Sequence, residues 1–103
     1  MDKKINVYLD DCRDTPEGFQ IRVHTYEETI QVLKKMEGFI GTLSLDNDLG
    51  EEKEGKDVMD WIEKQFYTKK YKLPAKIVVH SMNPIAKQRM LTTIDRLYGE
   101  KNG

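Results

Sequence analysis

Two kinds of segment alternate along this chain, and this alternation restricts the fold most. One kind is a short apolar run, and the other has apolar residues at helical spacing. Strands that alternate with helices are typical of a mostly parallel sheet flanked by helices. We therefore expect one α/β domain over residues 1–103. The predicted strands are short and rich in β-branched or other apolar residues, and they cover residues 5–9, 20–25, 42–46 and 75–80.

Two helices are predicted on either side of the third strand. The first follows a capping box in which Thr25 is the N-cap and Glu28 is the third helical residue, and Gly38 and Gly41 are expected to end it. The second follows the charged loop 51–56. Its apolar stripe consists of Val58, Met59, Ile62 and Phe66.

The third helix is predicted to begin at the sequence SMNP. Ser81 or Asn83 can act as the cap, and Pro84 suits the first helical position because its missing N–H has no partner there anyway. Gly99 is expected to stop this helix.

Composition excludes several classes of protein. The net charge is −1, so no global basic field indicates non-specific binding to nucleic acid, and no signal for DNA binding is present. Cys12 is the single cysteine, which excludes an internal disulfide and favours a reducing compartment. The opening residues MDKKINVYLDD lack the apolar core of a signal peptide, and no apolar run is long enough to span a membrane. We expect a cytoplasmic protein without a membrane partner.

Acidic residues and one histidine follow three of the predicted strands. Asp10 and Asp11 follow the first strand, Asp46 and Asp48 the third, and His80 ends the fourth. Ligand sites in open parallel sheets lie beyond the carboxyl ends of the strands, and neighbouring strands lie about 4.8 Å apart. These side chains are therefore expected to converge on one pocket.

Crowded carboxylates repel one another, and a divalent cation relieves that repulsion. Mg²⁺ and Mn²⁺ prefer oxygen ligands, so Asp10, Asp11 and Asp46 are the predicted ligands. Aspartate also favours strand ends and turns for conformational reasons alone, and that interpretation stays open for each residue separately.

Four stretches together resemble the motifs of a known family: VYLDDCRDTPEGF, LSLDNDLG, GKDVMDWI and VVHSMNP. In this order they are similar to the cyclic-phosphate-processing receiver-like domains, a compact offshoot of the response-regulator receiver fold. The resemblance implies a compact three-layer α/β fold, with a four-stranded, mostly parallel sheet in the order 2-1-3-4 and about three helices. It also implies action on a cyclic phosphate, either the 2′,3′-cyclic end of an RNA or a cyclic nucleotide.

The resemblance also assigns roles to individual positions. Asp10 and Asp11 match the acidic pair that holds a divalent ion in receivers, Asp46 matches the phosphoacceptor, and Ser81 matches the conserved hydroxyl. The chain departs from a receiver in three ways: loop 12–19 replaces the first helix, no fifth strand is visible, and Asp48 and His80 are additions. Signalling by phosphotransfer is therefore not expected, and Asp48 and His80 are the catalytic candidates.

The remaining candidates each have a structural alternative. His80 suits a general acid, because histidine exchanges protons near neutral pH, but a strand-end histidine also bonds to backbone carbonyls. Arg13 suits bidentate contact with phosphate or a salt bridge to the aspartates. Asn83 and Lys87, at the start of the third helix, suit phosphate binding, although Asn83 also suits a helix cap and Lys87 a solvated surface.

Two classes of function stay open from the sequence. The first is a phosphoesterase that uses Mg²⁺ or Mn²⁺ to open a cyclic phosphate. The second is a module that binds a nucleotide or a partner protein at the same acidic edge without chemistry. Four aspartates repel an anion unless a cation is present. Dependence on a metal is therefore the observation that separates a plain anion binder from the other candidates.

Overall fold

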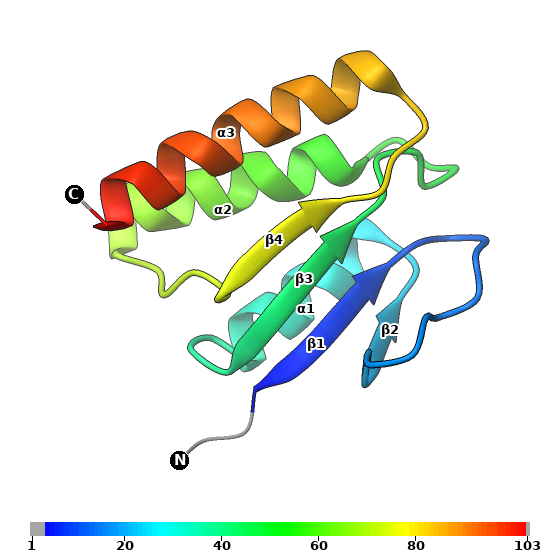
Figure 1. The fold of residues 1–103 in the computed structure, drawn as a ribbon, viewed down its shortest axis with the longest axis horizontal. Helices are drawn as coiled ribbons and strands as arrows, with labels where there is room; N and C mark the ends of the chain where they lie inside the picture. The colour runs from blue at the N-terminus through cyan, green and yellow to red at the C-terminus, as the bar shows by residue number, and fades with distance from the viewer. Residues whose placement is uncertain (1–3, 103) are drawn as a thin grey trace.

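A computed structural model describes residues 4–102 (Figure 1). None of the helices in that range has the length and apolar composition needed to cross a membrane. The strands are β1 (Ile5–Leu9), β2 (Ile21–Val23), β3 (Ile40–Leu45) and β4 (Lys76–Val79). The helices are α1 (Tyr26–Lys35), α2 (Gly55–Lys69) and α3 (Pro84–Asn102).

The four strands form one parallel sheet in the order β2-β1-β3-β4. The predicted α/β class, the sheet order and the three helices are confirmed. The register places Leu9 beside Leu45 and Leu45 beside Val79, so β1, β3 and β4 end at the same level. The residues that follow these three strands therefore start from one edge of the sheet.

All three helices cover one face of the sheet. Side chains alternate between faces along a strand, and Val7, Leu9, Leu43 and Leu45 join one buried cluster with residues from every helix. The helical members of that cluster are Ile30, Leu33, Val58, Met59, Ile62, Met90, Ile94 and Leu97. Helices therefore form one layer of the predicted compact fold, and within residues 4–102 no helix covers the second face of the sheet.

The connection between β1 and β2 lies against that second face instead. The ring of Phe19 lies 5.3 Å from the ring of Tyr8, which is buried in β1. Arg22 ties the connection to β2, since its side chain donates to the backbone oxygen of Asp10 and to the hydroxyl of Thr15. The third layer is thus a loop rather than a helix.

The predicted start signals of α1 and α3 are confirmed. Thr25 Oγ1 accepts a hydrogen bond from the Glu28 amide, while Glu28 Oε1 accepts one from the Thr25 amide. Asn83 Oδ1 accepts a hydrogen bond from the Ala86 amide at the start of α3. Two glycines differ from expectation. Gly41 lies within β3 rather than ending α1, and α3 runs through Gly99.

Packing explains the continuation of α3. A glycine inside a helix costs only about 1 kcal/mol relative to alanine. Leu97 is fully buried, and the hydroxyl of Tyr98 donates to the backbone oxygen of Pro74 over 2.5 Å. These two anchors hold the helix directly before a glycine that local propensity alone would have made a stop.

Candidate active site at the carboxyl edge of the sheet

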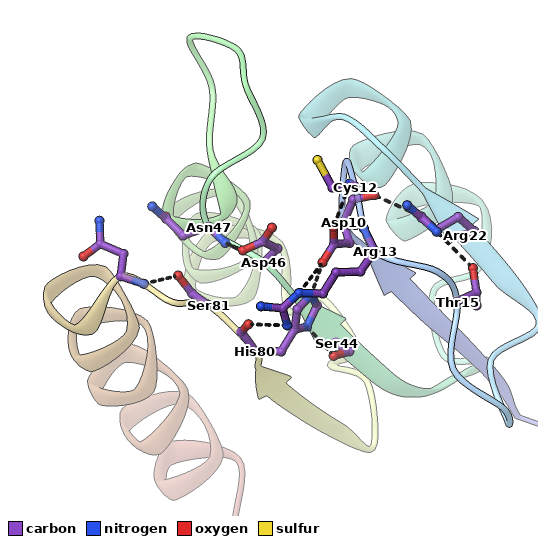
Figure 2. Close-up of polar contacts among 11 residues, drawn as sticks. Asp10, Cys12, Arg13, Thr15, Arg22, Ser44, Asp46, Asn47, His80 and Ser81 are labelled. Atoms are coloured by element: carbon purple, nitrogen blue, oxygen red, sulfur yellow. Dashed lines mark hydrogen bonds and ion pairs between the residues drawn. The ribbon is translucent and has the colours of Figure 1, made fainter.

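Asp10, Asp46 and His80 are the first residues after β1, β3 and β4. Because the three strands end in register, these residues occupy one level of the sheet edge. Asp46 donates its backbone N–H to the Leu9 oxygen, and His80 donates its own to the Leu45 oxygen. One ligand atom from each of the three side chains lies within 4.8 Å of the others (Figure 2). The predicted convergence of Asp10, Asp46 and His80 is therefore present.

Asp10 is the most buried of the three, with 1% of its surface exposed. Its Oδ1 accepts hydrogen bonds from the amides of Cys12 and Arg13, both at 2.8 Å, and its Oδ2 lies 3.1 Å from Nε2 of His80. Burial acts to raise the pKa of Asp10, but the two amides and the imidazole outweigh burial and lower it. Asp10 is thus held as a carboxylate. It also makes an aspartate turn, as expected if aspartate stands at a strand end for conformational reasons.

Asp46 has the opposite electrostatic environment. Burial, followed by the negative charge of Asp10, raises the pKa of Asp46, and the amide of Asn47 only partly offsets these effects. The next residue explains how the sequence Asp-Asn-Asp fits a strand end. Asn47 is buried, its backbone oxygen accepts from the Gly55 amide, and its Oδ1 accepts from the Lys56 amide. Asn47 therefore fastens the first turn of α2 to the end of β3.

The ring of His80 is held on three sides. Its Nε2 contacts Asp10, its Nδ1 lies 2.7 Å from the hydroxyl of Ser44, and its plane stacks on Tyr8 at 4.6 Å and 8°. With Asp10 ionised, Nε2–H donates to the carboxylate and Nδ1 accepts from the Ser44 hydroxyl. These contacts (Figure 2) fix the orientation of a side chain that is 17% exposed, so His80 is oriented and still reachable.

The donor set fits a divalent cation. Two carboxylates suit Mg²⁺ and Mn²⁺, and an imidazole in the same group favours Mn²⁺ over Mg²⁺. Burial, and after it the negative charge of Asp10, raise the pKa of Asp46, and a cation at the two carboxylates would relieve the second of these effects. Asp10 and Asp46 would hold the ion, with His80 Nε2 within reach of the same position.

Asp11 and Asp48 lie outside this compact group of donors. Both are exposed; Asp11 lies beside Gly50, and Asp48 accepts a hydrogen bond from the side chain of Asn47. Asp11 as a metal ligand and Asp48 as a catalytic residue therefore stay predictions. The charge of Asp11 raises the pKa of the Cys12 thiol, which disfavours the reactive thiolate there.

Arg13 lies at the mouth of the site with 49% of its side chain exposed. Its Nε is 3.9 Å from Oδ2 of Asp10, and one guanidinium nitrogen donates to the backbone oxygen of His80 over 3.4 Å. An exposed ion pair of this length contributes little stability, typically below about 1 kcal/mol. Its guanidinium is thus available to an anion at the site.

The residues predicted to bind phosphate are brought together only in part. Ser81 is buried beside Asp46, and its Oγ accepts from the amide of Asn83, which is itself the cap of α3 (Figure 2). Lys87 is exposed, and within residues 4–102 no hydrogen bond or ion pair joins its side chain to the site. Arg89, which the sequence analysis did not select, lines a hollow of about 200 Å³ with Asn47 and Asn83. The phosphate-binding roles of Ser81, Asn83 and Lys87 stay predictions.

Two further residues contact the site, and each carries a signal in the sequence. Ser44 lies within a predicted strand, and its polar side chain alternates with Leu43 and Leu45 and so marks the face opposite the helices. Asn47 stands between Asp46 and Asp48. Its signal was an amide between two carboxylates at a strand end, where a side chain that both donates and accepts can cap a following helix.

Comparison with known proteins agrees with this geometry. The model of the cyclic-phosphate processing receiver domain matches residues 5–96, which is most of the chain. The chain belongs to this family. No curated protein and no solved structure matches the chain significantly. Membership links this receiver domain to cyclic-phosphate processing, and it confirms the resemblance carried by the four motifs.

The electrostatics of Asp46 make a testable prediction for this receiver domain. Its raised pKa means that the folded state binds the proton more tightly than the unfolded state, so stability falls as pH rises from below 3.8, the ordinary pKa of an aspartate, through the folded pKa. Asp46→Asn keeps the acceptor for Asn47 and removes the charge. In EDTA at pH 7 we expect it to stabilise the protein by at most about 1 kcal/mol, since solvent screens this partly exposed group.

Thermal unfolding measures this effect, with a rise in Tm of up to about 4 °C for a domain of this size. The advantage should shrink at pH 3, where wild-type Asp46 is itself protonated. Asp60→Asn, which removes the same charge from an exposed position on α2, is the control and should leave the Tm unchanged. Equal stability of wild type and Asp46→Asn at pH 7 would contradict carboxylate repulsion at the site.

Proposed function

We propose that this protein is a phosphoesterase that opens a cyclic phosphate, at a 2′,3′-cyclic RNA end or in a cyclic nucleotide, with the help of Mg²⁺ or Mn²⁺. The observation that carries the proposal is the convergence of Asp10, Asp46 and His80 at one strand-end level. A divalent cation at the two carboxylates would neutralise charge on the phosphate oxygens. Membership of a cyclic-phosphate-processing family supports the choice of substrate.

His80 has the role of general acid in this proposal. Water adds to the phosphorus as the bond to one ribose oxygen breaks, and that leaving oxygen needs a proton. Nε2 of His80 faces Asp10, and once the ring carries a proton on both nitrogens it would pass the Nε2 proton to a substrate oxygen that replaces this contact and return to its neutral form. Ser44 and Tyr8 position the ring from the other side, through Nδ1 and through stacking. They act through His80 and do not themselves contact the substrate.

The positive charge for the substrate comes from Arg13. Its half-exposed guanidinium stands beside both Asp10 and the backbone of His80, so a phosphate at the carboxylates would lie within its reach. Arginine binds phosphate oxygens in pairs, and the strength of such bonds grows as charge develops on those oxygens. The buried hydroxyl of Ser81, the residue after His80, is the second candidate donor.

The test is a hydrolysis assay with and without metal. We expect cyclic mononucleotides or short RNAs with a 2′,3′-cyclic end to be converted to open phosphomonoesters in the presence of Mg²⁺ or Mn²⁺, and EDTA to stop the conversion. Mass spectrometry detects the addition of one water. Wild-type protein that binds such a ligand with metal and releases it intact after long incubation would favour the sequestering module instead.

A further inference from the structure

The charges of this protein are separated along the strand direction, which its net charge of −1 conceals. At the edge where the strands begin, here called the amino edge, the segments 34–39, 69–76 and 98–102 gather with Lys4 (Figure 1). They contain two carboxylates, Glu37 and Glu100. Against these stand eight lysines: Lys4, Lys34, Lys35, Lys69, Lys70, Lys72, Lys76 and Lys101.

Helix ends do not account for this surplus of lysines. The carboxyl end of a helix carries about half a negative elementary charge, which basic residues in the last turn offset. Three helices end at the amino edge, so their dipoles balance only a minor part of a surplus of six positive charges. The excess charge is therefore available to a partner.

Four of these lysines surround one hollow of about 340 Å³. Lys4, Lys70, Lys72 and Lys101 line it together with Phe66 and Tyr71, and no carboxylate in residues 4–102 does so. All four lysines are exposed, and none of them forms an ion pair in the described part of the chain. An anion in this hollow would meet cations whose charge is not already neutralised.

Lys70 has an unusual backbone conformation. It is the C-cap of α2 with φ +54° and ψ +42°, and among residues 4–102 it is the one residue other than glycine with a positive φ. Glycine is the usual residue in this left-handed cap, because a side chain is disfavoured there. Lys70 adopts this unfavourable conformation and also lines the hollow. Together these two features indicate a function for its side chain.

Aromatic rings accompany the lysines. Tyr71 also borders a second hollow of about 330 Å³, which Lys34, Lys69 and Trp61 line together with one carboxylate, Glu37. Phe66 and Trp61 are half-buried whereas Tyr71 is buried, so Phe66 and Trp61 are the rings that a base can contact. Cations that follow a phosphate backbone, interleaved with rings on which bases stack, are typical of surfaces that bind single-stranded nucleic acid.

We propose that the amino edge binds single-stranded nucleic acid, with the lysines on its phosphates and the rings of Phe66 and Trp61 on its bases. The amino edge lies at the opposite end of the strands from Asp10, Asp46 and His80. Binding at the amino edge requires no chemical step. Bases in a duplex already stack on one another, so they do not reach recessed rings. The partner is therefore a single strand rather than a duplex.

The test uses a fluorescently labelled single-stranded RNA of 12 nucleotides with an ordinary 3′-hydroxyl, which the proposed hydrolase cannot cleave. Fluorescence anisotropy should show binding at 50 mM salt that weakens about 50-fold at 200 mM, as expected for about four phosphate contacts. Lys72→Glu and Lys101→Glu should each weaken binding by about tenfold. Lys53→Glu makes the same charge change at the acidic edge and should alter binding less than about twofold.

Lys70→Gly separates binding from folding. Glycine adopts the left-handed cap without strain, so this variant should have a Tm equal to or above wild type and yet bind the RNA several-fold more weakly. Wild-type binding that does not depend on salt, or equal losses in Lys72→Glu and Lys53→Glu, would overturn the proposal. A duplex of the same sequence, or vesicles of phosphatidylserine and phosphatidylcholine, bound as tightly as the single strand would also overturn it.

Discussion

Replacing His80 with glutamine should slow the opening of a cyclic phosphate by about 10²–10⁴-fold, the usual contribution of a general acid. The amide of glutamine reaches the position of Nε2 and preserves a donor toward Asp10, which lies 3.1 Å from the ring nitrogen. It does not exchange protons, so affinity for substrate should stay within a few-fold of wild type. Steady-state kinetics at saturating metal measure kcat and KM separately.

The second histidine of the chain provides a matched control. His24 is 54% exposed, lies beside Glu28 just before α1, and is not one of the three converging donors. His24→Gln should leave kcat unchanged. Turnover of His80→Gln within a few-fold of wild type would show that His80 only packs. If His80→Gln instead abolishes the rise in Tm on adding Mn²⁺, the imidazole is a ligand of the cation rather than the acid.

Gly55→Ala should be the most destabilising small substitution in the protein. A Cβ at this position would lie 2.0 Å from the backbone oxygen of Asp46 and 2.9 Å from Cα of Asn47. Backbone cannot move aside as a flexible side chain does, so we expect a loss of about 3 kcal/mol or more, above the usual cost of overpacking. For a domain of this size, that lowers the Tm by about 12 °C or more. Thermal and urea unfolding measure the loss.

The shift of α2 that Gly55→Ala causes should also reach the candidate site, because the first turn of α2 rests on the end of β3. Gly55→Ala should therefore weaken the stabilisation by Mn²⁺ as well as the fold. Gly99→Ala is the matched control: nothing lies within 4 Å of its Cβ, and it occupies the interior of α3. It should be neutral or stabilising by up to about 1 kcal/mol. Equal stability of Gly55→Ala and Gly99→Ala would contradict the close approach of α2 to β3.

Much of the site was predictable because its members follow strands. Asp10, Asp46 and His80 come directly after apolar segments, and parallel strands bring such positions to one edge. Ser44 was not predictable in the same way. Its contact with His80 joins residues 36 positions apart, and it requires a serine on the polar face of β3 to lie opposite a histidine beyond β4.

The sequence by itself determined the order of the elements, the start signals of α1 and α3, and the acidic carboxyl edge. Those features depend on local periodicity, on capping side chains and on the direction of parallel strands. Only the tertiary structure decided which face the helices cover, that α3 continues through Gly99, and that lysines from separate segments surround one hollow. These features depend on packing between segments distant along the chain, where burial of side chains such as Leu97 outweighs the propensity of a single glycine.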